Sequence, residues 1–234
     1  IPVGQTTANS AAVPVRADDA YLQGNQNVTV GITSTSGGNY EALTTTSTVT
    51  TVVADDADAT AVTLTAAANA TEGGSVVYTA TVANAVTGTP LVITLTNGAT
   101  ITIPVGQTTA NSAAVLVRAD DAYVQGNQSL VVGITGTTGG NYEALTTTST
   151  VTTVVADDAD ATAVTLSAAA NATEGGSVVY TATVAIAVTG TPLVITLTNG
   201  ATMTIPVGQT TANSAAVPVR ADDAYLQGNQ NVTV

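Results

Sequence analysis

Apolar and polar residues alternate through most of the chain, which is the pattern of half-buried β-strands. Between residues 58 and 159, seven short segments alternate in this way, with turn-forming residues between them. No segment carries apolar residues at a convincing helical spacing. The predicted strands cover residues 61–65, 75–82, 91–96, 99–104, 112–118, 128–135 and 148–155.

One side of most of these segments is apolar, and those side chains should face a common core because neighbouring side chains of a strand point to opposite faces. The Asn97-Gly98 pair favours a tight hairpin, since both residues tolerate positive φ. The residues predicted to point inward are Val62, Leu64, Val76, Tyr78, Ala80, Val82, Leu91, Ile93, Leu95, Ala113, Val115, Val117, Leu130, Val132 and Ile134.

The chain is built from a long repeat. Residues 1–102 and 103–204 align without a gap and differ at ten positions, and residues 205–234 repeat residues 1–30. This period fits a small domain rather than a solenoid coil. The apolar residues are mainly small, with 3% aromatics, which suits thin sheets packed face to face. We therefore predict an all-β fold: tandem immunoglobulin-like seven-stranded antiparallel β-sandwiches in a linear array.

The repeat boundaries divide the chain into three parts. The leading segment (residues 1–57) is the C-terminal part of one repeat, and the complete repeat covers residues 58–159. The trailing segment (residues 160–234) is the N-terminal part of the next repeat. The chain therefore reads as a window of a longer array, and its part-repeats would be completed by more of the same chain or by another molecule.

Charge and composition exclude several classes of function. The net charge is −13, with 16 acidic and three basic side chains and no His or Cys. Nucleic acids and anionic membranes need basic partners, so neither is expected to bind. No apolar run approaches the roughly 20 residues that span a bilayer, so we expect no membrane insertion. Catalysis would have to rest on a carboxylate pair alone, and we predict that the protein is not an enzyme.

Nearly all the acidic residues fall in three repeated motifs. One is Arg-Ala-Asp-Asp-Ala-Tyr, another is Ala-Thr-Glu-Gly-Gly, and the third is the hinge, Val-Val-Ala-Asp-Asp-Ala-Asp, at residues 52–58 and 154–160. The acids of these motifs are Asp18, Asp19, Asp55, Asp56, Asp58, Glu72, Asp120, Asp121, Asp157, Asp158, Asp160, Glu174, Asp222 and Asp223.

Strand direction predicts that these motifs meet. If each strand runs the length of the sandwich and the next runs back, Glu72, Asp120–Asp121 and Asp157–Asp160 arrive at one end, while Glu143 lies at the opposite end. Clustered carboxylates repel one another, and calcium accepts six to eight oxygen ligands from several loops. We therefore predict calcium at the repeat junctions, with all fourteen acids of the three motifs as ligands. Magnesium, or Asp residues that serve only as turn formers, are the alternatives.

The complete repeat resembles a Calx-β-type calcium-binding sandwich. The resemblance rests on Thr71-Glu72-Gly73-Gly74, Val105-Gly106-Gln107 and Ala119-Asp120-Asp121, with Gly126-Asn127 following. It implies that Glu72, Asp120, Asp121, Asp157 and Asp158 are metal ligands. The chain departs from that family at Gln125 and Gln128, where the family often has two Glu, which implies fewer ions or weaker binding.

The whole chain resembles the extender repeats of large RTX adhesins, the type-1-secreted biofilm adhesins. Near-identical tandem units, Thr/Ala/Val bias, missing Cys and Asp-rich linkers carry this resemblance. It implies a secreted, extracellular stalk at the cell surface that calcium rigidifies, in support of adhesion and biofilm formation. Its partners would be neighbouring repeats, with end-to-end or fibre self-association open. The alternative is a calcium-dependent binding module, lectin-like or homotypic, which would need an exposed contact patch away from the junction.

Overall fold

The computed structural model describes residues 1–234 and contains two compact units. The first unit consists of Ile1–Ala119 and Asn127–Ala156, and the second of Asp120–Gly126 and Asp157–Val234. The first unit therefore holds the leading segment and most of the complete repeat. The second holds the trailing segment together with residues 120–126 and 157–159 of the complete repeat.

Every regular element is a strand, which confirms the all-β prediction. No helix long and apolar enough to cross a membrane is present. The strands of the first unit are β1 (Gln26–Gly31), β2 (Thr48–Val53), β3 (Ala59–Thr65), β4 (Asn69–Thr71), β5 (Ser75–Val76), β6 (Thr79–Val82), β7 (Leu91–Leu95), β8 (Thr100–Ile103), β9 (Thr109–Asn111), β10 (Val115–Leu116), β11 (Gln128–Thr138), β12 (Ala144–Thr146) and β13 (Thr150–Ala156).

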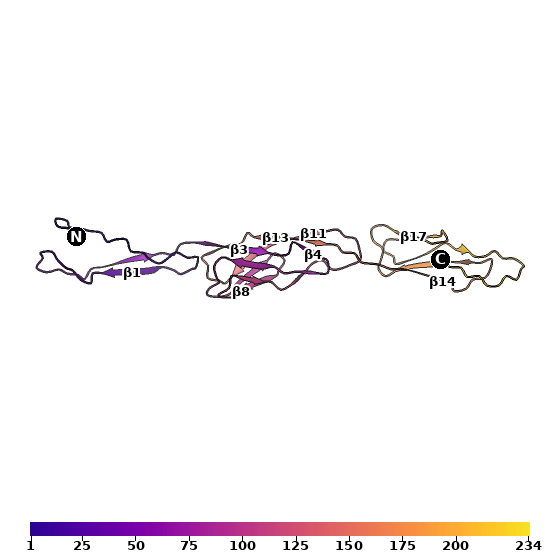
Figure 1. The fold of residues 1–234 in the computed structure, drawn as a ribbon, viewed down its shortest axis with the longest axis horizontal. Coiled ribbons are helices and arrows are strands. Elements are labelled where there is room, and N and C mark those ends of the chain that lie inside the picture. Colours follow the sequence, from indigo (N-terminus) through magenta and orange to yellow (C-terminus); the bar gives the residue numbers. More distant parts are fainter. The chain divides into compact units, whose positions relative to one another are not determined.

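The complete repeat forms two main sheets, visible as the strand-rich purple and pink part of Figure 1. One sheet has the order β4-β13-β11-β7-β8 and the other β12-β3-β6-β9, and β10 pairs separately with β5. Most pairs are antiparallel, but β4 joins β13 and β12 joins β3 in parallel. These two short strands were not predicted: both lie in the connections between the predicted strands.

A single core joins the two sheets, as a β-sandwich requires. Most of its buried residues come from β3 and β6 of one sheet and from β7, β8 and β11 of the other, and β5 adds Val76. The inward positions predicted for the first three strands are confirmed, since each is at most 4% exposed. The buried core residues are Val62, Leu64, Val76, Tyr78, Ala80, Val82, Val86, Leu91, Ile93, Leu95, Ile101, Ile103 and Val132.

The fifth predicted strand is interrupted, and the inward position predicted for Ala113 is wrong. Ala113 is exposed and Ser112 is buried in its place. The Ser112 N–H donates to the Tyr78 carbonyl at 2.8 Å, and its hydroxyl accepts the Tyr78 N–H at 3.0 Å. The break between β9 and β10 shifts the alternation by one residue, so Val115 and Val117 still turn toward the core and are half-buried.

The predicted hairpin joins β7 to β8. The Gly98 N–H donates to the Leu95 carbonyl, and the Leu95 N–H to the Ala99 carbonyl, both at 2.9 Å. Of the Asn97-Gly98 pair only the glycine has a positive φ, 82°. The connection is therefore a three-residue hairpin loop with glycine at the left-handed position, rather than a two-residue turn with two left-handed residues.

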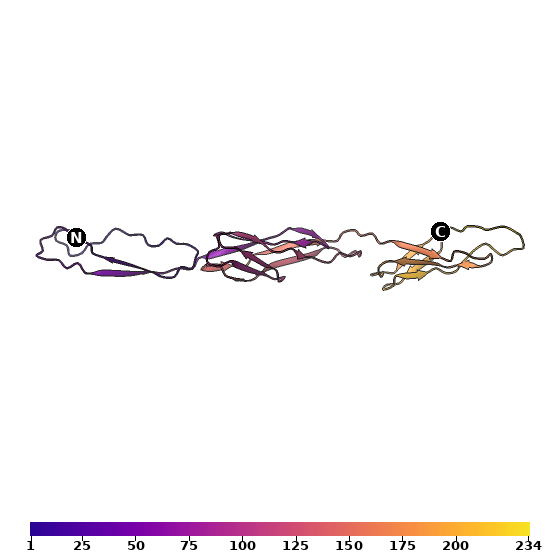
Figure 2. The same ribbon diagram turned by 90° about the horizontal axis from the view of Figure 1, so that it is seen from below.

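The leading segment repeats part of this architecture without a second layer, as Figure 2 shows for the indigo strands. Strands β1 and β2 pair in the same register as β11 and β13, with Val30 opposite Val49 as Val132 is opposite Val151. Val30 is 58% exposed, whereas its counterpart Val132 is 4% exposed. The pairing seen between β11 and β13 thus forms in the leading segment too, whereas burial of its side chains requires the facing sheet.

The second unit has a smaller core, which includes Tyr180, Ala182 and Ile205. Its strands form a three-stranded sheet, β14-β16-β19, and two pairs, β15-β20 and β17-β18. They are β14 (Val164–Ala168), β15 (Ser177–Val178), β16 (Tyr180–Val184), β17 (Leu193–Thr196), β18 (Thr202–Ile205), β19 (Thr211–Asn213) and β20 (Val217–Pro218).

Candidate functional site

The second Asp of each Arg-Ala-Asp-Asp-Ala-Tyr motif shapes its own loop. In the leading segment, the Tyr21 N–H donates to Asp19 Oδ1 at 2.9 Å, and the Gln23 side-chain amide donates to Asp19 Oδ2. Both carboxylate oxygens of Asp19 therefore have partners within the loop, an arrangement of the Asx-turn type. The same contacts form at Asp121 and Asp223.

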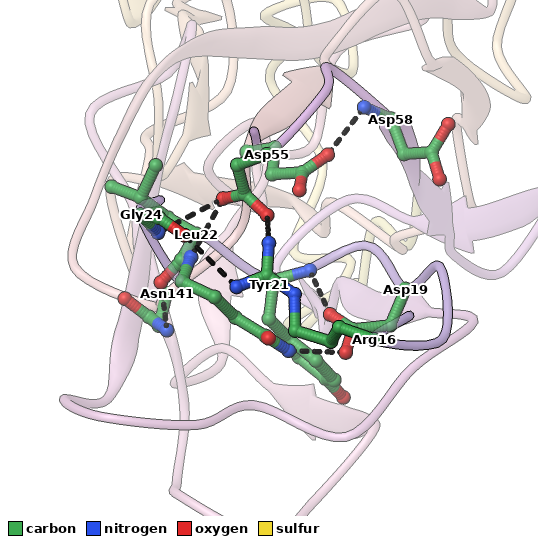
Figure 3. Close-up of polar contacts among 10 residues, drawn as sticks. Arg16, Asp19, Tyr21, Leu22, Gly24, Asp55, Asp58 and Asn141 are labelled. Carbon is green, nitrogen blue, oxygen red and sulfur yellow. Dashed lines mark hydrogen bonds and ion pairs between the residues drawn. The ribbon is translucent and has the colours of Figure 1, made fainter. Parts of the chain in front are cut away.

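The first Asp of the hinge fixes this loop to the end of β2 (Figure 3). Arg16 forms an ion pair with Asp55 at 2.6 Å, and the N–H groups of Gln23 and Gly24 donate to Asp55 Oδ2 at 2.7 and 3.2 Å. These contacts lower the pKa of Asp55: the Gln23 N–H is the largest cause, and the Gly24 N–H and Arg16 add to it against desolvation. Asp55 thus engages the only basic side chain of the leading segment.

Three other carboxylates lie close together at the same junction. Oxygen atoms of Asp18, Asp56 and Asp58 all lie within 4.8 Å of one another. The pKa of Asp18 is raised, first by the charge of Asp56 and next by that of Asp58. Arg16 forms its ion pair with Asp55, so the leading segment has no second basic side chain to neutralise these three negative charges. We call Asp18, Asp56 and Asp58 the acidic cluster, and it offers only hard oxygen donors.

Glu143 also reaches this junction, although its position in the sequence did not predict a metal ligand. Its Oε2 accepts the Asp58 N–H at 2.5 Å, and its own N–H donates to the Ala20 carbonyl at 3.2 Å. Its Oε1 is buried without a hydrogen-bond partner. Strand direction placed Glu143 at the end opposite Glu72. Applying the same argument to the end where the preceding segment attaches would have identified it.

Glu72 lies in the first unit, just after β4, and its side chain is 1% exposed. Arg118 contacts Glu72 Oε2 through Nε at 2.8 Å and through a terminal nitrogen at 2.7 Å. Glu72 Oε1 is buried without a hydrogen-bond partner. In the second unit, Glu174 and Arg220 repeat this ion pair at 2.6 Å, with both side chains about 30% exposed.

The remaining predicted ligands belong to the second unit. Asp157 Oδ2 accepts the Gln125 N–H at 2.9 Å, as Asp55 accepts that of Gln23. The counterparts of the acidic cluster, 102 positions later, are all exposed, as are the two acids near the end of the chain. That these residues bind a metal stays a prediction. These exposed acids are Asp120, Asp158, Asp160, Asp222 and Asp223.

Comparison with known proteins gives one family match. A family model described as the LapA domain matches residues 1–56, 58–158 and 160–234. The matched ranges are separated at Ala57 and Ala159, between the second and third Asp of each hinge. Neither a curated protein nor a solved structure matches the chain.

Proposed function

Because the chain belongs to the LapA domain family, a family of large biofilm adhesins rather than of enzymes, we propose that it is a stalk of structural extender repeats from a secreted, cell-surface adhesin. Three consecutive family matches and near-identical repeats support a spacer, since a spacer needs length rather than variety. The stalk would hold an adhesive domain away from the cell and so support biofilm formation. The resemblances to RTX extender repeats and Calx-β sandwiches are part of this proposal.

The proposal includes calcium at the repeat junction, and the acidic cluster is the observation that carries it. Two ligands of one calcium ion at 2.3–2.6 Å can lie up to about 5 Å apart, and the cluster's oxygens lie within 4.8 Å of one another. Carboxylates are hard ligands suited to calcium, and the chain has no His or Cys for softer metals. The unpartnered Glu143 Oε1 nearby also favours a cation.

A shared ion would stiffen the hinge. Asp18 lies in the leading segment, whereas Asp58 directly precedes β3 of the complete repeat. An ion bound by both would restrict rotation of the backbone between them. Because the sequence repeats every 102 residues, we extend the proposal to Asp120, Asp158 and Asp160, the counterparts of the acidic cluster. Within the first unit, Glu72 is a separate candidate ligand, because its Oε1 is buried without a hydrogen-bond partner.

The test is calcium titration of the 234-residue chain, read by isothermal calorimetry, melting temperature and small-angle scattering. We expect calcium to bind, to raise the melting temperature and to lengthen the particle. Asp18→Asn should reduce the amount of calcium bound and the lengthening. Asp222→Asn is the matched control, because it alters the same motif where no hinge follows within the chain. If calcium does not bind to the unmodified chain, or if Asp18→Asn and Asp222→Asn behave alike, the acidic cluster is not a calcium site.

A further inference from the structure

Two tyrosines from different segments meet at the same junction. Tyr21 belongs to the loop of the leading segment, and Tyr142 to the connection between β11 and β12. Their rings stack with centroids 5.6 Å apart and planes 29° apart. We propose that residues 20–22 form a latch with residues 84–85 and 141–143, a repeat-to-repeat interface that holds successive repeats together without metal.

Backbone hydrogen bonds join the two sides of the latch. The Leu22 N–H donates to the Asn141 carbonyl at 3.0 Å, and the Asn141 side-chain amide donates back to the Leu22 carbonyl at 3.1 Å. The Glu143 N–H donates to the Ala20 carbonyl at 3.2 Å. The two loops thus pair like a short antiparallel ladder, with an isolated bridge at its centre. Figure 3 shows Leu22 and Asn141 side by side.

Both tyrosine hydroxyls are bound to one turn of the complete repeat. Tyr21 donates to the Ala85 carbonyl and Tyr142 to the Asn84 carbonyl, each at 2.6 Å. This turn connects β6 to β7. Because the acceptors are backbone carbonyls, the contacts do not depend on the side chains of the turn. Burial raises the pKa of Tyr142, with Tyr21 as a second cause.

The tyrosine contact recurs in the second unit, where the Tyr123 hydroxyl donates to the Ala187 carbonyl at 2.8 Å. The loop that carries the tyrosine is shaped before it binds. At Tyr225, which is 77% exposed, the bond from its N–H to Asp223 is already present at 2.8 Å. A preorganised loop loses little conformational entropy on docking. Asp19 therefore acts as a positioning residue for the latch.

The receiving loop is also fixed by its backbone. Gly139 has a φ of 76°, and a Cβ at this position would lie 2.1 Å from the Pro90 carbonyl oxygen. Gly140 has a φ of 68°, a left-handed conformation that glycine adopts without strain. Gly139 thus lets the chain pass close to Pro90, and Gly140 adds a second left-handed residue just before Asn141 and Tyr142. The Gly-Gly-Asn-Tyr sequence is thus a signal for the latch.

The latch proposal depends on the proposed stalk function in one respect only: the partner that the latch binds is the neighbouring repeat. Its bonds use backbone groups, hydroxyls and rings, whereas the acidic cluster uses carboxylates. It can therefore be tested in the absence of calcium, and failure of the calcium proposal would leave the result unaffected.

The experiment is hydrogen exchange of the 234-residue chain in a chelator, with the Leu22 and Glu143 amides as reporters because they donate across the latch. We expect both amides to be protected in the unmodified chain. Tyr142→Ala should speed their exchange by about tenfold or more, since stacking and a hydrogen bond are lost together. Tyr40→Ala, at the same repeat position but 72% exposed, should change neither amide.

A milder variant separates the latch from general unfolding. Tyr21→Phe keeps the ring and removes one hydrogen bond, so exchange of the reporters should rise by roughly threefold to tenfold while the β3 and β6 amides stay protected. Tyr225→Phe is its matched control and should have no effect. The proposal is overturned if the reporters are unprotected without calcium, or if Tyr21→Phe leaves their exchange unchanged.

Discussion

Replacing Leu64 with Ala tests how much stability the second sheet contributes. Leu64 in β3 is 4% exposed and belongs to the core cluster, whereas Leu166, its counterpart in β14, is 44% exposed. Leu64→Ala removes three buried carbons, about 2.4 kcal/mol at about 0.8 kcal/mol each. The cavity left between two packed sheets raises the cost to about 3–4 kcal/mol. Leu166→Ala should cost about 1 kcal/mol, since no closed cavity forms.

Hydrogen exchange read by mass spectrometry resolves the two units within one sample. At about 1.4 kcal/mol per tenfold, Leu64→Ala should speed exchange of the β3 and β6 amides by roughly 100-fold or more. Leu166→Ala should speed exchange of the β14 and β16 amides by about tenfold or less. Equal effects of the two substitutions would refute the reasoning, because local sequence rather than burial would then set stability.

Two further predictions concern the junction and the hairpin. The pKa of Asp55 is lowered from 3.8, so its stabilisation is present above that pH and is lost as the pH falls through the lowered value. Asp55→Asn should therefore lower the calcium-free melting temperature at neutral pH and weaken its acid dependence, measured between about pH 6 and 3; an unchanged pH profile would contradict this role. Gly98→Ala should destabilise by about 1–2 kcal/mol in urea denaturation, because its φ is 82° with open space around it. Gly136→Ala, with open space and no left-handed φ, is the control and should change stability by less than about 0.5 kcal/mol.

The core could be predicted because the alternation of apolar and polar residues follows from the alternating direction of side chains along a strand. Val62, Leu64, Leu91, Ile93 and Leu95 face the same interior, and each lies in a regular strand where every second side chain points inward. Ala113 could not be placed in this way. The backbone is irregular there, and a hydrogen-bonded serine occupies the buried position.

The short parallel strand β4 lay beyond sequence reasoning for a different reason. Asn69–Thr71 has no apolar alternation, and its extended conformation depends on a partner more than 80 residues later, β13. Strand pairing of this kind is a tertiary effect.

The acids of the candidate site divide into roles that composition does not reveal. Sequence motifs placed Asp18, Asp19, Asp55 and Asp56 together as one class of residue. In the structure Asp19 closes its loop and Asp55 binds Arg16 and two N–H groups, which leaves Asp18 and Asp56 in the acidic cluster. A sequence shows where a carboxylate stands in the chain, but not which of its oxygens already accept hydrogen bonds.

The parallel pairing of β4 with β13 determines how the proposed stalk would resist a pulling force. The chain enters the complete repeat through β3 and β4 and leaves it through β13, so tension along the chain acts parallel to these strands. The ladder that joins Asn69, Ala70 and Thr71 to residues 154–156 is then loaded in shear. All of its hydrogen bonds must then break at the same time, whereas the bonds of a hairpin pulled apart from its open end break one after another. Under the proposed stalk function, such a repeat would bear a steady force between a cell and a surface.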